Sequence, residues 1–191
     1  MDWAVDFVSS VDRADMKILR ETLEAKQKAD SGQYGEAARI LWELLVQLRH
    51  GKNRKWECIT MVHMGKVYRA LRWSIAQSLL EDALELAGKL DLARVKMMAL
   101  AELGEMTCQL GKLEESLELL RRALELVEEG DERSRRTILL DLAIAYEGLG
   151  DLERCREVLL ESVAIGRAVH DPEVEEDQVH LSRISAALGV R

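Results

Sequence analysis

Proline and aromatic residues are scarce in this chain of 191 residues, which has one proline and only 4% aromatic residues. Proline interrupts helix interiors, so its scarcity favours long helices. β-Sandwiches and barrels are rich in β-branched and aromatic side chains, so the low aromatic content argues against them. Hydrophobic residues make up 48% of the sequence, which is enough to bury a core. The composition therefore predicts a folded, all-α protein.

Signatures of metal binding, disulfides and catalysis are missing from the sequence as well. Cys58, Cys108 and Cys155 are odd in number and far apart, with no C-x-x-C pair. They therefore form neither a disulfide framework nor a zinc signature, and we expect small buried residues. The four histidines have no ligand spacing, and no nucleophile elbow, Walker loop or dinucleotide fingerprint is present. We predict no metal, no cofactor and no enzymatic activity.

The net charge of −8 predicts that nucleic acid is not a partner, because such proteins need a basic face. Two local basic stretches, 49–55 and 133–136, fall between predicted helices. We interpret them as solvated linkers, with contacts to an acidic partner as the alternative. The first residues lack the pattern of a signal peptide, and no apolar run approaches about 18 residues. We therefore expect no membrane association and a cytoplasmic location.

An internal repeat of about 39 residues organises the chain. The two clearest copies place Gly111 and Gly150 39 residues apart, and the surrounding apolar positions keep that offset. An earlier copy around Gly65 lacks one residue in its inner turn, and a first copy around Gly32 matches poorly in its first helix. Atypical end units are expected of stacked arrays, since their outer faces meet water.

Each copy reads as a helical hairpin with a seam of small residues. A glycine after the first helix suits the left-handed cap conformation. Small residues and leucines then recur on one face of the second helix, so that the hairpins must stack to bury it. The small positions are Ala37, Ala76, Ser116 and Cys155, and the leucines are Leu41, Leu80, Leu120 and Leu159.

The pattern L-G-x-x-Y, then G-x-x-x-x-A, then L-x-x-A-L resembles the tetratricopeptide repeat (TPR) over roughly residues 15–170. The units are longer than the family's usual length of about 34 residues, and are similar to those of kinesin light chains and bacterial TPR regulators. The resemblance implies a right-handed α-solenoid of about four hairpins plus terminal helices, in a single domain over 1–191. The predicted ranges are a helix at 1–12, repeats at 15–50, 57–89, 94–129 and 134–170, and a capping helix at 172–188.

The two terminal helices leave alternatives open. Asp171 and Pro172 are typical of a helix start, and the last helix is expected to cap the fourth unit. Alternatively, it folds into the groove or swaps into a partner chain. The amphipathic segment 1–12 is expected to pack on the first unit, with a detachable docking segment or a dimer contact as the alternative.

The same resemblance implies that the first helix of each unit lines an inner, concave surface. Apolar residues at these positions, with charged residues further along each helix, predict a groove for a helix or an extended peptide. The alternative is that the protein's own helices cover them. The implied partner-binding residues are Ile59, Val62, His63, Lys66, Arg69, Met98, Ala101, Glu105, Thr137, Leu140, Ile144 and Glu147.

The predicted function is a non-enzymatic protein–protein interaction module that binds a helix or peptide of a partner protein in this groove. One alternative is a regulatory or sensor domain of a signalling system. The other is a self-associating scaffold that forms homodimers through its terminal helices.

Overall fold

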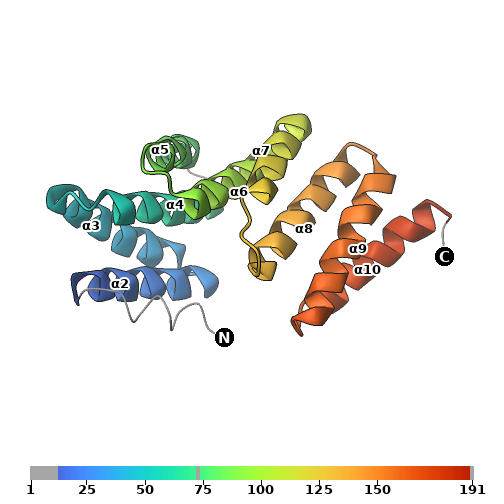
Figure 1. Ribbon diagram of the computed structural model, residues 1–191, viewed down its shortest axis with the longest axis horizontal. Helices are drawn as coiled ribbons and strands as arrows, with labels where there is room; N and C mark the ends of the chain where they lie inside the picture. Colours follow the sequence, from blue (N-terminus) through green and yellow to red (C-terminus); the bar gives the residue numbers. More distant parts are fainter. Residues whose placement is uncertain (1–12, 72–73, 190–191) are drawn as a thin grey trace. The chain divides into compact units, whose positions relative to one another are not determined.

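Helices make up all the regular structure in this computed structural model, which describes residues 13–71 and 74–189 (Figure 1). The predicted all-α solenoid of helical hairpins is confirmed. The predicted helix at 1–12 lies outside the described residues. The chain divides into two compact units, Met1–Leu90 (unit 1) and Asp91–Arg191 (unit 2).

Unit 1 consists of two helical hairpins. The first pairs α2 (Arg13–Asp30) with α3 (Tyr34–Gly51), and the second pairs α4 (Arg54–Ala70) with α5 (Ile75–Lys89). Each helix packs against the next one in sequence. The core between the hairpins is therefore built from consecutive helices, as in a stacked array.

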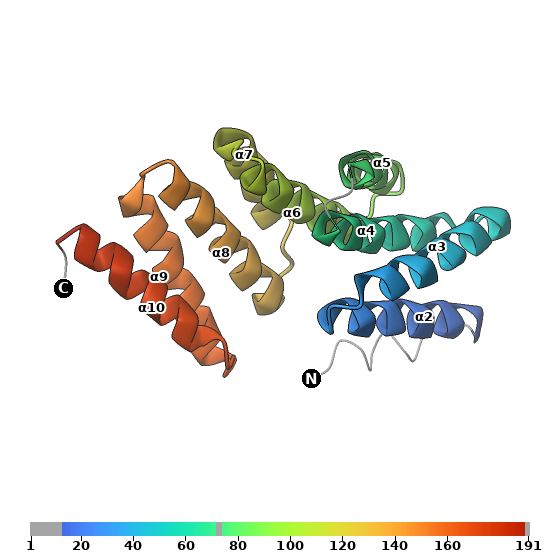
Figure 2. The same cartoon turned by 180° about the vertical axis from the view of Figure 1, so that it is seen from behind.

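Unit 2 continues the same arrangement with two hairpins and one further helix, seen from behind in Figure 2. Each predicted repeat overlaps one helix pair, while the single-domain organisation with the predicted boundaries stays a prediction. The helices are α6 (Ala93–Gln109), α7 (Leu113–Glu125), α8 (Glu132–Gly148), α9 (Leu152–Ala168) and α10 (Val174–Ala187).

A seam of small residues lets the two helices of each hairpin approach closely. A Cβ atom added to Gly104 in α6 would lie 2.6 Å from Cγ of Leu120 in α7, so this position has no room for a larger side chain. The small residues and leucines of the predicted seam are at most 1% exposed. They are Ala37, Ala76, Ser116 and Cys155, with Leu41, Leu80, Leu120 and Leu159.

The two basic stretches are parts of helices, so their interpretation as linkers is wrong. Residues 133–136 lie in the first turns of α8, and Arg136 is buried. In the stretch 49–55, only two residues separate α3 from α4. Arg49 and Arg54 both pair with Glu57, whose side chain is 5% exposed. Arg49 and Arg54 therefore neutralise one buried carboxylate, that of Glu57, a role that composition alone does not indicate.

The hydroxyl of Thr60 in α4 is fully buried and has no hydrogen-bond partner, unlike other buried side-chain polar atoms of the described residues. Thr60→Val should therefore raise the free energy of unfolding by about 1 kcal/mol, because valine has the same shape without the unpaired oxygen. Urea unfolding measures this as a higher midpoint at constant slope. Thr22→Val is the control, since the buried Thr22 hydroxyl donates to the Ile18 carbonyl at 2.9 Å. A gain of equal size in the control would contradict the explanation.

Candidate functional site

The predicted groove residues of unit 1 lie on α4. The apolar ones among them are buried or partly buried by packing. Val62 is 2% exposed and is part of the core rather than of a free surface. Ile59 is partly buried against Leu44, Leu48 and Trp56. Of the polar candidates on α4, Lys66 is exposed, whereas His63 and Arg69 are half-buried.

In unit 2 the 39-residue register aligns apolar side chains across three helices. Ala101 on α6, Leu140 on α8 and Val179 on α10 occupy one equivalent position. Ala101 and Leu140 are half-buried, whereas Val179 is 71% exposed. Ile144, one turn after Leu140, is 53% exposed. We define the inner face of unit 2 as these four residues with the half-buried Met98.

The remaining candidates surround this face. Glu105 is half-buried on α6, and Thr137 is exposed on α8, where its hydroxyl donates to the Arg133 carbonyl at 3.0 Å. Glu147 is already engaged by α10, as described below. The sequence reasoning missed Val179, which one further step of 39 residues from Leu140 would have found.

The last helix, α10, has the form of the first helix of a fifth unit. Its buried residues, Leu181 and Ile184, are 6% and 2% exposed, and the helix packs on α9 of its own chain. Three positions that are buried in α8 become polar in α10, which no later helix covers within the described residues. The replacements are Leu139 by Gln178, Ala143 by Ser182 and Tyr146 by Ser185.

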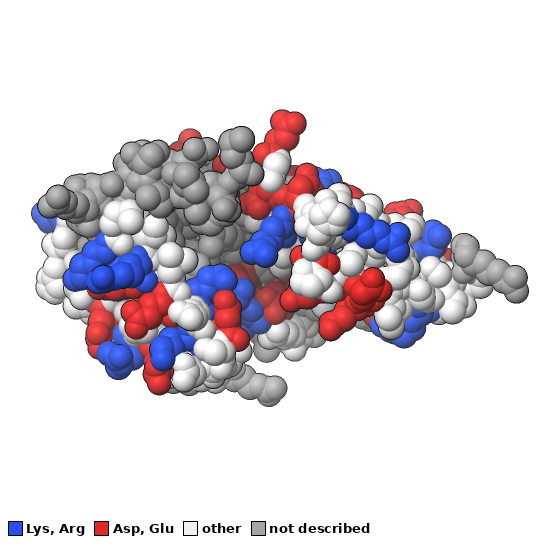
Figure 3. Space-filling view, turned by 90° about the horizontal axis from the view of Figure 1, so that it is seen from below, with Lys and Arg blue, Asp and Glu red and all other residues white. Residues whose placement is uncertain are grey.

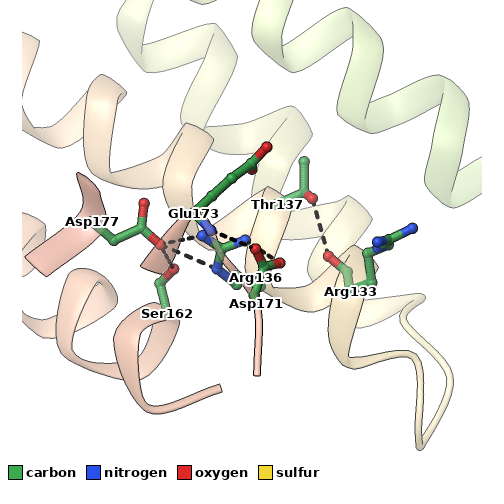
Figure 4. A network of polar contacts seen from close by, with 7 residues as sticks. All are labelled: Arg133, Arg136, Thr137, Ser162, Asp171, Glu173 and Asp177. Atoms are coloured by element: carbon green, nitrogen blue, oxygen red, sulfur yellow. Dashed lines mark hydrogen bonds and ion pairs between the residues drawn. The ribbon is translucent and has the colours of Figure 1, made fainter. Parts of the chain in front are cut away.

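A buried ion-pair network joins α10 to α8 (Figure 4). Nη2 of Arg136 lies 2.6 Å from an Asp177 carboxylate oxygen, and Nη1 lies 2.7 Å from Asp171. The hydroxyl of Ser162 in α9 reaches the same Asp177 oxygen at 3.4 Å. The side chains of Arg136 and Asp177 are 7% and 10% exposed. Three segments of the chain thus meet at one guanidinium group.

The 39-residue register shows that this network is peculiar to the last interface. At the positions equivalent to Arg136 and Asp177, the preceding helices carry Met97 and Ile138, both buried and apolar. A buried ion pair contributes less net stability than well-packed apolar residues, but removing one partner is costly. The pair therefore makes the docking of α10 dependent on one specific alignment.

A second polar cluster lies further along α8 and α10. Glu147 accepts hydrogen bonds from both Nη atoms of Arg183, and it lies 2.8 Å from Nε2 of His180. The hydrogen bond from Arg183 lowers the pKa of the Glu147 carboxyl, so this cluster is held by a carboxylate at neutral pH. Cys155 of α9 is fully buried beside them, and burial raises the pKa of its thiol to about 11.

Mixed charge characterises the face of the molecule that Figure 3 shows. On the face in Figure 3, acidic and basic side chains are interspersed, without a broad basic area among the described residues. No helix within 13–71 or 74–189 combines the length and the apolar character that crossing a bilayer requires. The coarse surface chemistry is thus that of a charged helical array with local apolar positions.

Residues 96–173 match the family model of the tetratricopeptide repeat. This segment of the chain consists of tetratricopeptide repeats. The matched segment begins within α6 and ends just before α10, so it includes Arg136 and Asp171 of the ion-pair network but not Asp177. TPR arrays are general scaffolds for protein–protein interaction and are typically not enzymes, and their partners are proteins.

Solved structures extend the fold beyond the matched segment. The TPR-like repeats of a putative kinesin light chain from Podosopora anserina are 21% identical, with a TM-score of 0.71, covering 91% of this chain and 87% of that one. BtubC (BKLC) from P. vanneervenii is 18% identical, with a TM-score of 0.75 and coverages of 90% and 73%. MamA from Desulfovibrio magneticus RS-1 is 21% identical, with a TM-score of 0.61 and coverages of 91% and 86%. None of the curated proteins matches the chain.

Asp177→Ala should lower the free energy of unfolding of this protein by about 3 kcal/mol, because it leaves a buried guanidinium with Asp171 alone. Replacing both partners with the residues of the preceding interface, Arg136→Met with Asp177→Ile, should restore most of that loss. Urea unfolding followed by circular dichroism measures both changes.

The matched control is Glu161→Ala, which removes the half-exposed pair between Glu161 of α9 and Arg135 of α8, the helix that also carries Arg136. Pairs of this kind contribute less than about 1 kcal/mol. An Asp177→Ala variant no less stable than this control would show that the network does not hold α10.

Proposed function

We propose that this protein is a non-enzymatic interaction module whose unit 2 binds a helix or extended peptide of a partner protein along its inner face. The observation that carries the proposal is the exposure of Ile144 and Val179 on helices whose other large apolar residues are mostly covered. Burying such a side chain contributes about 1.5–3 kcal/mol, so two or three of them can anchor a peptide.

The chemistry of the face indicates what kind of segment would fit. Acidic residues border the apolar positions, namely Glu105 on α6, Asp141 on α8 and Glu176 on α10. A partner segment with an apolar stripe at helical spacing and basic residues beside it would complement this pattern. In unit 1, His63, Lys66 and Arg69 stay predicted partner contacts.

The predictions on location, partners and alternative functions that were made from the sequence stand beside this proposal. The cytoplasmic location and the absence of nucleic-acid partners rest on composition. The sensor and scaffold alternatives remain as well, although the cis packing of α10 on α9 supports a cap rather than a swapped dimer.

Ile144→Glu combined with Val179→Glu should weaken partner binding by about tenfold or more, because each change places a charge where apolar contact is expected. Proteins captured by the immobilised wild type are identified by mass spectrometry. The affinity of a purified partner segment is then measured for each variant.

Trp42→Glu serves as the matched control, because Trp42 on α3 is 53% exposed, the same fraction as Ile144. It should leave the affinity unchanged. Equal loss in the control, or no loss in the double variant, would rule out the inner face of unit 2 as the binding surface.

A further inference from the structure

Three potential metal ligands converge where α8, α9 and α10 meet. They are a carboxylate oxygen of Glu147, the sulfur of Cys155 and a ring nitrogen of His180. All three atoms lie within 4.8 Å of one another. Around a tetrahedral zinc ion, neighbouring ligand atoms are about 3.5 Å apart. Small side-chain rotations would therefore bring these atoms to coordination distance.

The composition of the cluster selects among metals. Thiolate, imidazole and carboxylate together suit Zn²⁺, whereas Ca²⁺ and Mg²⁺ prefer oxygen ligands alone. We propose that Glu147, Cys155 and His180 bind one Zn²⁺ ion, with water as the fourth ligand. The site would tie α10 to both helices of the last hairpin, independently of any partner on the inner face.

Packing alone does not require these residue types. The 39-residue register relates Glu147, Cys155 and His180 to Cys108, Ser116 and Asp141 in the preceding interface. There, the buried Ser116 fills the seam and donates to the Gly104 carbonyl at 2.7 Å. Serine thus suffices at the position of Cys155. Of these two interfaces, the one formed by α8, α9 and α10 combines sulfur, nitrogen and carboxylate ligands.

Binding would rearrange the hydrogen bonds of the cluster in a defined way. Zn²⁺ bonds to the sulfur of Cys155 while the thiol proton leaves to solvent, so one proton is released for each ion bound. Neutral His180 supplies a nitrogen lone pair, and Glu147 supplies a carboxylate oxygen. Arg183 must release Glu147, which its 61% exposed side chain can do by turning into solvent.

The experiment uses the full, untagged chain, reduced and stripped of metal with EDTA. Zinc affinity is measured by competition with a chromophoric indicator, and Co²⁺ serves as a spectroscopic probe. The wild type should bind one Zn²⁺, and its Co²⁺ form should show a thiolate-to-metal charge-transfer band. Cys155→Ser and His180→Gln should each weaken Zn²⁺ binding by about tenfold or more, and Cys155→Ser should abolish the band.

Two further variants separate coordination from folding. Cys108→Ser removes a thiol outside the cluster and should leave Zn²⁺ binding and the band unchanged. Arg183→Ala removes a competing cation and should tighten Zn²⁺ binding, which a loss of structure would not do. The proposal is overturned if the wild type takes no Zn²⁺ from the indicator, or if Cys155→Ser binds as tightly as the wild type.

Discussion

The buried ion pair between Arg136 and Asp177 is the interaction on which the proposed binding face of unit 2 depends. The seam between the two helices of a hairpin, by contrast, is formed by small residues and leucines, and such apolar contacts are not directional. A guanidinium buried with two carboxylates does not tolerate a shift in alignment, because a displaced α10 would leave a charge without a partner in a low-dielectric interior. Arg136 of α8 therefore constrains the alignment of α10 more sharply than the apolar packing of α10 on α9 does.

Two features follow from that position. Val179 extends the apolar row formed by Ala101 and Leu140 only when α10 continues the 39-residue register. His180 and Arg183, on the same helix, reach Glu147 only in that alignment. The proposed partner face and the proposed zinc site thus share a common structural condition, although they use different residues and different chemistry.

The sequence predicts the hairpins well because local physics sets them. Gly111 and Gly150 take the left-handed conformation after their helices, with φ of +77° and +76°, and the small seam residues are buried as expected. Exposure is predicted poorly. Val62 and Val179 occupy equivalent repeat positions, yet they are 2% and 71% exposed, since burial depends on the side chains that neighbouring helices bring.

The ion-pair network escaped prediction for a related reason. Repeat spacing indicates where the helices recur but not where each begins, so residues 133–136 are mistaken for a linker. Arg136 and Asp177 are also separated by 41 positions, and no local pattern links them. The same holds for Glu147, Cys155 and His180, which show no ligand spacing along the chain.

Amide hydrogen exchange across α10 tests the central claim most directly. If α10 is docked by the buried ion pair, the amides of residues 178–187 should exchange with protection comparable to that of α8 and α9, because they open only when the last interface opens. Exchange of these amides at the rate of an unstructured peptide, while α8 and α9 stay protected, would contradict the account.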